Sequence, residues 1–179
     1  ERLFGLTNPQ GNHSEDVKEC YYYLRATPTH SYQKALYKYP QLRFPYEELV
    51  QENGKRSRLD PEYELIDTGV FDDNNYYDIA IEYAKASPED ILINITITNR
   101  SKLPAQLHLL PQIWFRNTWS FGGKHLSGST KPSMWREGPD RIQLMRETLG
   151  EYCLEFDKDI RRRGFLFTDN ATNHQKLFN

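Results

Sequence analysis

The glycine-rich stretch Phe121-Gly122-Gly123-Lys124-His125 comes nearest to a phosphate-binding loop. A P-loop needs a glycine, four further residues and then Gly-Lys-Ser/Thr, because successive amides cradle the phosphates and the hydroxyl group binds magnesium. Here His125 stands where the hydroxyl group is needed, and no glycine precedes Gly123 at the required spacing. We therefore interpret residues 119–132, which are rich in glycine, serine and lysine, as a surface loop.

The histidines and acids give no recognisable metal site. No two histidines have the i,i+4 spacing of a helical zinc site. His13 lies near Glu15, Asp16 and Glu19, which together offer nitrogen and oxygen donors. Their spacing matches no known ligand pattern, so we interpret them as a solvated acidic turn and expect neither a metal ion nor another cofactor.

Local spacing also gives no support to covalent or acid–base catalysis. Ser14 lies beside His13 in sequence only, and Cys153 alternates onto the polar face of its expected strand. Adjacent carboxylates such as Asp72-Asp73 and Glu89-Asp90 are plentiful. Acid–base catalysis needs two carboxyl groups whose surroundings push their pKa values apart, and adjacency does not supply this. No active site is predicted.

Composition narrows the class of protein. The 179 residues are 37% hydrophobic and 13% aromatic, which is too aromatic for a disordered chain. Lys and Arg number 23 against 25 Asp and Glu, so there is no general electrostatic reason to bind nucleic acid or an anionic membrane. No run approaches the roughly 20 apolar residues that a membrane-spanning helix needs.

The cysteines and the chain start suggest a cellular location. Cys20 and Cys153 are too few for a disulfide framework, and reduced thiols in the cytoplasm are the simplest interpretation. The first residues show no basic start followed by an apolar stretch, so no signal peptide is expected. We expect the chain to be a piece of a longer polypeptide.

The middle of the chain has the clearest pattern. Apolar residues alternate with polar ones over 77–83 and again over 91–97, with a polar break around Pro88. A period of two presents one apolar and one solvated face. The pattern predicts a β-hairpin, that is, an antiparallel pair.

Similar short runs follow the hairpin and are expected to be strands: 107–109, 113–115, 142–146, 152–156 with a turn over 148–151, and 165–167. In the first third, 33–39 and 46–52 are expected to be short helices, the second with Pro45 near its start and Gly54 just past its end. Short strands separated by polar breaks predict a mainly β fold, an antiparallel β-sandwich formed by residues 1–179 as a single domain.

Several motifs together resemble a known family. They are Gly11–Glu19, Thr27–Tyr32, Asp67–Phe71, Pro88–Ile91, Leu110–Trp119 and Thr168–Asn173. In this order they are similar to the N-terminal region of bacterial glucosidase-like proteins of glycoside hydrolase family 63, which is related to the mannosyl-oligosaccharide glucosidases. The stretches Gly11–Glu19 and Trp114–Trp119 together are the most specific.

The resemblance implies an N-terminal β-sandwich of the super-sandwich type, followed by a larger (α/α)6 barrel. That barrel holds the Asp general acid and the Glu general base of an inverting hydrolase, which stand about 6.5–9.5 Å apart. No part of the 179 residues matches the barrel, so no catalytic residue is assigned to this chain. The sandwich is expected to be incomplete, and an exposed strand edge would then favour self-association.

The resemblance also implies an indirect role in carbohydrate metabolism. The chain is expected to pack on the catalytic barrel of the same polypeptide and to shape its oligosaccharide pocket, without acting alone. The residues expected at this interdomain seam are Trp114, Arg116, Asn117 and Trp119, followed by Asn12, His13 and Asp16 in a polar loop near the pocket. Two alternatives remain: a freestanding carbohydrate-binding module whose aromatic rings stack on glycan, and a structural domain unrelated to sugars.

Overall fold

A computed structural model describes residues 19–117, 119, 130–158 and 164–169 of the chain. The chain divides into two compact units, Glu1–His108 and Leu109–Asn179. Each unit is built around its own antiparallel sheet.

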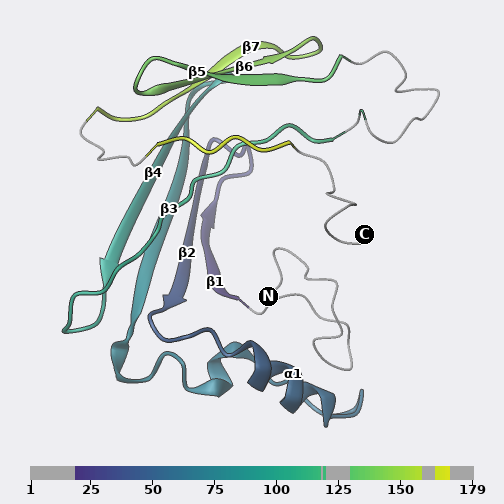
Figure 1. Ribbon diagram of the computed structural model, residues 1–179, viewed down its shortest axis with the longest axis vertical. Coiled ribbons are helices and arrows are strands. Elements are labelled where there is room, and N and C mark those ends of the chain that lie inside the picture. Colours follow the sequence, from purple (N-terminus) through teal and green to yellow (C-terminus); the bar gives the residue numbers. More distant parts are fainter. Residues whose placement is uncertain (1–18, 118, 120–129, 159–163, 170–179) are drawn as a thin grey trace. The chain divides into compact units, whose positions relative to one another are not determined.

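The first unit contains a four-stranded sheet with the strand order β1-β2-β3-β4 (Figure 1). Its strands are β1 (Cys20–Ala26), β2 (Tyr32–Pro40), β3 (Tyr76–Ser87) and β4 (Asp90–Asn99). The predicted hairpin over 77–97 is confirmed, with Ile79 opposite Ile97 and Ile81 opposite Ile95. Its alternating pattern and the Pro88-Glu89 break are local signals, which is why the sequence alone identified it.

Strand β2 corrects the expected helix over 33–39. It pairs with β3 over its whole length, from Tyr32 opposite Ala84 to Pro40 opposite Tyr76. Lys, Ala and Leu in this segment favour a helix by intrinsic propensity, but that preference is weak and pairing with a neighbouring strand overrides it. The final proline fits because it occupies the last position of the ladder.

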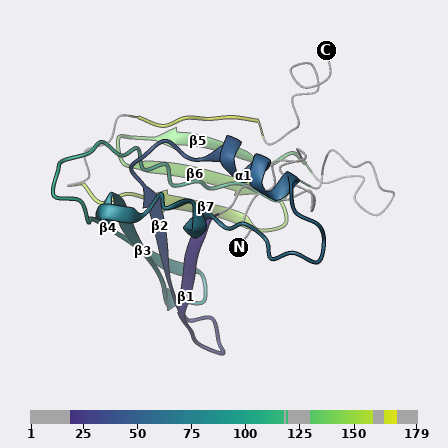
Figure 2. The same cartoon turned by 90° about the horizontal axis from the view of Figure 1, so that it is seen from below.

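The predicted helix over 46–52 is confirmed as α1 (Tyr46–Gly54). Two short 3-10 turns follow, η1 (Leu65–Thr68) and η2 (Asp72–Asn74). Leu49, Leu65 and Val70 form the buried core of this region, against which Phe44 and Phe71 pack. Figures 1 and 2 show α1 beyond the end of the sheet where β2 ends and β3 begins.

Asn53 ties α1 to the segment that follows it. Its side chain is only 1% exposed. The amide nitrogen donates to the backbone carbonyl of Tyr63 at 3.0 Å, and the amide oxygen accepts from the backbone N–H of Tyr63 at 2.8 Å. One buried side chain therefore satisfies both backbone groups of a residue that has no strand partner.

The second unit contains a three-stranded meander of β5 (Ser133–Glu137), β6 (Arg141–Arg146) and β7 (Gly150–Glu155). The predicted pairing of 142–146 with 152–156 is confirmed, with Ile142 opposite Leu154. Gly150 closes the turn at φ 83°, a left-handed conformation that favours glycine. Cys153 is exposed and opposite Gln143, as its alternation predicted.

The strands expected over 107–109, 113–115 and 165–167 are absent from the described parts 104–117 and 164–169. Pro104 precedes the first run and Pro111 separates the first two, and proline cannot donate to a strand ladder. Phe165 instead packs its ring against Phe156 and Phe167, with centroids 5.6 and 6.5 Å apart. These apolar residues pack as side chains without extending a sheet.

The fold is therefore mainly β and antiparallel, as the sequence predicted, with one α-helix among the described residues where two short helices were expected. The face-to-face sandwich arrangement stays a prediction.

Candidate functional site

The sheet of the first unit has two chemically different faces. Residues directly opposite one another on antiparallel strands point to the same side of a sheet. The polar face carries Lys34 and Lys38 from β2, Asp78 and Glu82 from β3, and Asn94 from β4. It holds the most concentrated set of polar contacts in the described part of this unit.

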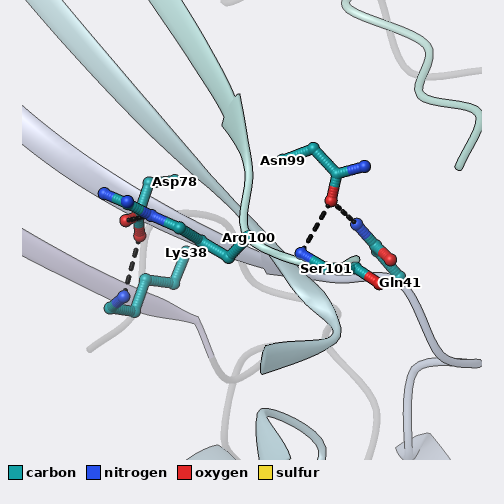
Figure 3. A network of polar contacts seen from close by, with 6 residues as sticks. All are labelled: Lys38, Gln41, Asp78, Asn99, Arg100 and Ser101. Atoms are coloured by element: carbon teal, nitrogen blue, oxygen red, sulfur yellow. Dashed lines mark hydrogen bonds and ion pairs between the residues drawn. The ribbon is translucent and has the colours of Figure 1, made fainter. Parts of the chain in front are cut away.

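Asp78 is the centre of the first polar cluster, which consists of Lys38, Asp78 and Arg100 (Figure 3). The Lys38 Nζ donates to Asp78 Oδ1 at 2.7 Å, and the Arg100 Nε donates to Asp78 Oδ2 at 2.6 Å. The Lys38 ammonium also lies 4.2 Å from the centroid of the Tyr76 ring. Asp78 is only 8% exposed, so these cations compensate a charge that water hardly reaches.

The two cations decide the ionisation state of Asp78. Burial raises its pKa, but the hydrogen bonds from Lys38 and Arg100 outweigh burial and leave the pKa below its usual value. For Lys38, burial lowers the pKa, but the contact with Asp78 contributes to a net increase above the usual value. The ammonium therefore stays charged. A carboxylate held in this way stays ionised near neutral pH and is not a proton donor, and the cluster acts as a clamp between β2, β3 and the end of β4.

Asn99 extends this clamp to the neighbouring loops. Its side-chain oxygen accepts from Gln41 Nε2 at 2.7 Å and from the backbone N–H of Ser101 at 2.9 Å (Figure 3). Its amide nitrogen donates to the carbonyl of Leu103 at 2.9 Å. One side chain thus fixes the chain as it leaves β2 and as it leaves β4.

Glu82 is the centre of a second polar cluster, four residues further along β3. It accepts hydrogen bonds from the Tyr32 hydroxyl group, from Lys34 Nζ at 3.3 Å and from Asn94 Nδ2 at 3.2 Å. The hydrogen bond from Tyr32 is the main reason that the pKa of Glu82 is lowered. Like Asp78, Glu82 is held as a carboxylate by fixed donors, an arrangement that favours cross-strand register over acid–base chemistry.

The opposite face of this sheet is apolar, and we call it the apolar face. On β3 and β4 it comprises Tyr77, Ile79, Ile81, Tyr83, Ile91, Ile93, Ile95 and Ile97. Its exposure changes along the hairpin: Tyr77 is 4% exposed, whereas Ile93 near the turn is 49% exposed. Tyr83, opposite Ile93, is also largely exposed. A contiguous exposed patch of branched and aromatic side chains is typical of an interaction surface.

The residues expected at the interdomain seam differ in their exposure to solvent. Trp114 is 54% exposed, whereas Asn117 and Trp119 are half-buried. The Arg116 carbonyl accepts from Arg146 Nη1 of β6 at 3.3 Å, and that guanidinium lies 6.0 Å from the Phe115 ring. The segment before Trp119 is thus attached to β6.

The second group of expected site residues, Asn12, His13 and Asp16, lies outside the described residues, as does the glycine-rich stretch 121–125. Within the described ranges, no three His, Cys, Asp or Glu residues are grouped to hold a metal ion. None of the described helices is long and apolar enough to span a membrane.

No motif in the sequence marks the Asp78 cluster. The alternation of Tyr77, Asp78 and Ile79 assigned Asp78 to the solvated face, yet all three are buried. No local signal marks a buried aspartate, because its partners Lys38 and Arg100 lie 40 and 22 residues away in sequence. A single charge flanked by apolar residues at the start of a strand was the only available hint.

Comparison with known proteins gives one informative match. The chain is 44% identical, over 209 residues, to the uncharacterized protein YMR196W of Saccharomyces cerevisiae. The alignment covers all of this chain but 19% of the yeast protein, so the chain spans about a fifth of the length of this relative. No family model matches the chain. No solved structure matches it either.

Proposed function

We propose that this chain is part of the non-catalytic N-terminal β-sandwich of a glucosidase-like protein of glycoside hydrolase family 63. In this proposal it packs on the catalytic barrel of the same polypeptide and shapes one wall of an oligosaccharide pocket. Hydrolysis of glucosides belongs to the whole protein, which we place in the cytoplasm because Cys20 and Cys153 are both free thiols.

The apolar face of the first-unit sheet is the observation that carries this proposal. Ile91, Ile93 and Tyr83 are each about half exposed. Leaving such side chains in water forgoes roughly 25 cal/mol for each Å² of apolar surface that could be buried. A second domain covering this end of the sheet would recover that free energy, as interdomain contacts generally do.

The state of the carboxylates supports a non-catalytic role. An inverting hydrolase needs one carboxyl group with a raised pKa as the acid and a second as the base. Asp78 and Glu82, the carboxylates at the centres of the two polar clusters, both have lowered pKa values and are held by donors from their own sheet or its flanking loop. The length of the yeast relative, of which the alignment covers 19%, leaves ample room for a separate catalytic domain.

Activity measurements on the isolated chain and on a longer polypeptide that contains it test the proposal. The isolated chain should release no glucose from α-glucosides above a blank, whereas the longer polypeptide should release it with inversion. Turnover by the isolated chain that is lost on changing one of its own carboxylates would refute the non-catalytic assignment. Absence of glucosidase activity in the longer polypeptide would refute the family assignment.

A pair of matched substitutions in the longer polypeptide tests the apolar face. Tyr83→Asp places a negative charge on the apolar face and should lower both activity and thermal stability. Thr96→Asp places the same charge on the exposed polar face of β4 and should change neither. Equal effects of the two variants would show that the apolar face is not a domain contact.

One observation favours a second candidate, a freestanding carbohydrate-binding module. Trp114 is 54% exposed, and a flat exposed ring can stack on the apolar face of a sugar. This candidate predicts that oligosaccharides change the tryptophan fluorescence of the isolated chain and that Trp119→Ala or Trp114→Ala abolishes the change. Trp135→Ala, on β5 and 43% exposed, is the matched control. No fluorescence change at millimolar oligosaccharide would exclude this candidate.

A further inference from the structure

Strand β4 is an open edge of the first-unit sheet. Within the described residues it pairs with β3 and with no other strand. The sheet has a second edge, β1, which pairs with β2. An open edge presents unpaired backbone N–H and C=O groups to whatever approaches it.

The direction of the backbone hydrogen bonds shows which residues of β4 present these groups. The Arg100 N–H donates to the Tyr76 carbonyl at 3.0 Å, so the backbone groups of Arg100 point toward β3. The backbone groups of the even-numbered residues of β4 point the same way. In an antiparallel strand alternate residues direct their backbone groups to opposite sides. Ile91, Ile93, Ile95 and Ile97 therefore direct their N–H and C=O groups outward.

The two edges differ in their protection against pairing. Proteins usually protect an edge with charged residues, proline or a bulge. Strand β1 has such features, since its register shifts between Tyr23 and Arg25 and Arg25 is charged. The stretch Ile91–Thr98 of β4 contains no charged residue, no proline and no glycine. Of the two edges, only β4 is built to accept another strand.

We propose that β4 pairs in an antiparallel manner with β4 of a second copy of this chain, about a two-fold axis through Ile95. In this register Ile95 lies opposite its own copy, and Ile93 lies opposite Ile97. The isoleucines of both copies then continue the same apolar face, because opposite residues share a face. The two four-stranded sheets become one continuous sheet.

Charge complementarity identifies a second copy as the occupant. The same register places Asp90 of each copy opposite Arg100 of the other, once at each end of the paired strands. Asp90 is exposed. The Arg100 side chain is 50% exposed while its Nε holds Asp78. A self-complementary pattern of this kind, with an acid at one end and a base at the other, is what an isologous two-fold interface requires.

The charges also favour this register over the one with Asn94 on the axis. With Asn94 on the axis, Asp90 would lie opposite Thr98 and would lose its cross-strand partner. A slip of one residue would place isoleucines opposite the polar face residues of the other copy. Pairing through the edge leaves both faces of the sheet uncovered, so this dimer neither requires nor excludes the function proposed above.

Sedimentation of the full 179-residue chain tests the dimer. The chain should sediment at twice its 21.2 kDa mass at micromolar concentration. Ile93→Lys places a charge in the middle of the edge and should weaken dimerisation at least tenfold, about 1.4 kcal/mol. Tyr23→Lys is the matched control on the other edge, where Tyr23 is 75% exposed, and it should leave the dimer intact. The proposal would be overturned if the chain were a monomer at ~100 µM or formed larger aggregates. It would also be overturned if Tyr23→Lys alone abolished the dimer.

A charge reversal tests the proposed salt bridge. Asp90→Lys would place lysine opposite Arg100 and should raise the dissociation constant severalfold at low salt, with a smaller effect at high salt. Glu89→Lys makes the same charge change one residue away, in the turn, and should have little effect. Equal effects of the two variants would show that net charge, rather than this pair, controls association.

Disulfide formation tests the register directly. In a background with Cys20→Ser and Cys153→Ser, Ile95→Cys places two thiols across the axis, where opposite Cα atoms lie about 5.5 Å apart. Mild oxidation should convert this variant to a covalent dimer. Ile91→Cys should resist oxidation, because Asn99 of the other copy lies opposite it. Equal cross-linking of both variants would indicate random association and would overturn the register.

Discussion

Lys38 and Asp78 lie opposite each other on the neighbouring strands β2 and β3, with the lysine Nζ 2.7 Å from the aspartate Oδ1. The Asp78 side chain is 11% exposed and that of Lys38 is 23% exposed, so this ion pair lies largely out of water. A shifted register of β2 against β3 would take Lys38 away from the buried carboxylate and leave only part of its charge compensated, which is destabilising. The pair therefore specifies the register of strands that the sequence pattern alone did not pair.

Replacing Asp78 by alanine should destabilise the first unit. The variant leaves the Lys38 ammonium half-buried without its anion, and the expected loss is about 3 kcal/mol of unfolding free energy. Urea denaturation followed by circular dichroism measures it. Leu92→Ala is the control. Leu92 lies on β4, is exposed on the same face of the sheet as Asp78, and its loss should cost much less. Equal losses would show that Asp78 contributes nothing beyond ordinary side-chain packing.

The stability of the first unit should fall in acid in a way that depends on Asp78. Its pKa is lower in the folded state than the usual value near 3.9, so its contribution is fully present above about pH 4. That contribution is lost as the pH falls through the folded-state pKa. The urea midpoint of the wild-type chain should drop as the pH falls below about pH 4, and that of Asp78→Asn should drop less over the same range. Parallel decreases in the two proteins would contradict the lowered pKa.

Asn53→Ala should loosen α1 from the segment that follows it. The substitution leaves both the N–H and the carbonyl of Tyr63 without their side-chain partner, at a cost of about 2–3 kcal/mol. Gln51→Ala removes a polar side chain from an exposed position of the same helix and should lower the unfolding free energy by less than about 1 kcal/mol. Thermal unfolding distinguishes the two variants. A small effect of Asn53→Ala would mean that water replaces the amide.

Arg146→Ala should free the segment that leads to Trp119. The guanidinium donates to the Arg116 carbonyl and lies over Phe115, so its loss exposes the backbone there. Trypsin should cleave after Arg116 severalfold faster in the native state, because cleavage requires local opening. Among the described residues, the Arg141 side chain bonds to Glu137 and Glu155, so Arg141→Ala, on the same strand, should leave this rate unchanged. An unchanged rate in Arg146→Ala would show that other contacts hold the segment.

Local patterns predicted the two hairpins correctly. Each of them, β3 with β4 and β6 with β7, joins alternating runs through a short polar turn, and all of these signals lie within about 25 residues. The helix α1 was also predictable, since Pro45 precedes its first residue and Gly54 marks its last turn. Strand β1 and strand β5 were not predicted, because neither has a regular apolar alternation of its own.

The sequence by itself determined a mainly β, antiparallel chain and the short helix over 46–52, because period-two alternation, turn residues and helix-end signals act between near neighbours. Only the tertiary structure decided that residues 33–39 form a strand, that Asp78 is buried between Lys38 and Arg100, and that β4 is left as an uncharged edge. These outcomes depend on which distant segments lie side by side. Burial and ion pairing act through space, and spacing along the chain does not encode them.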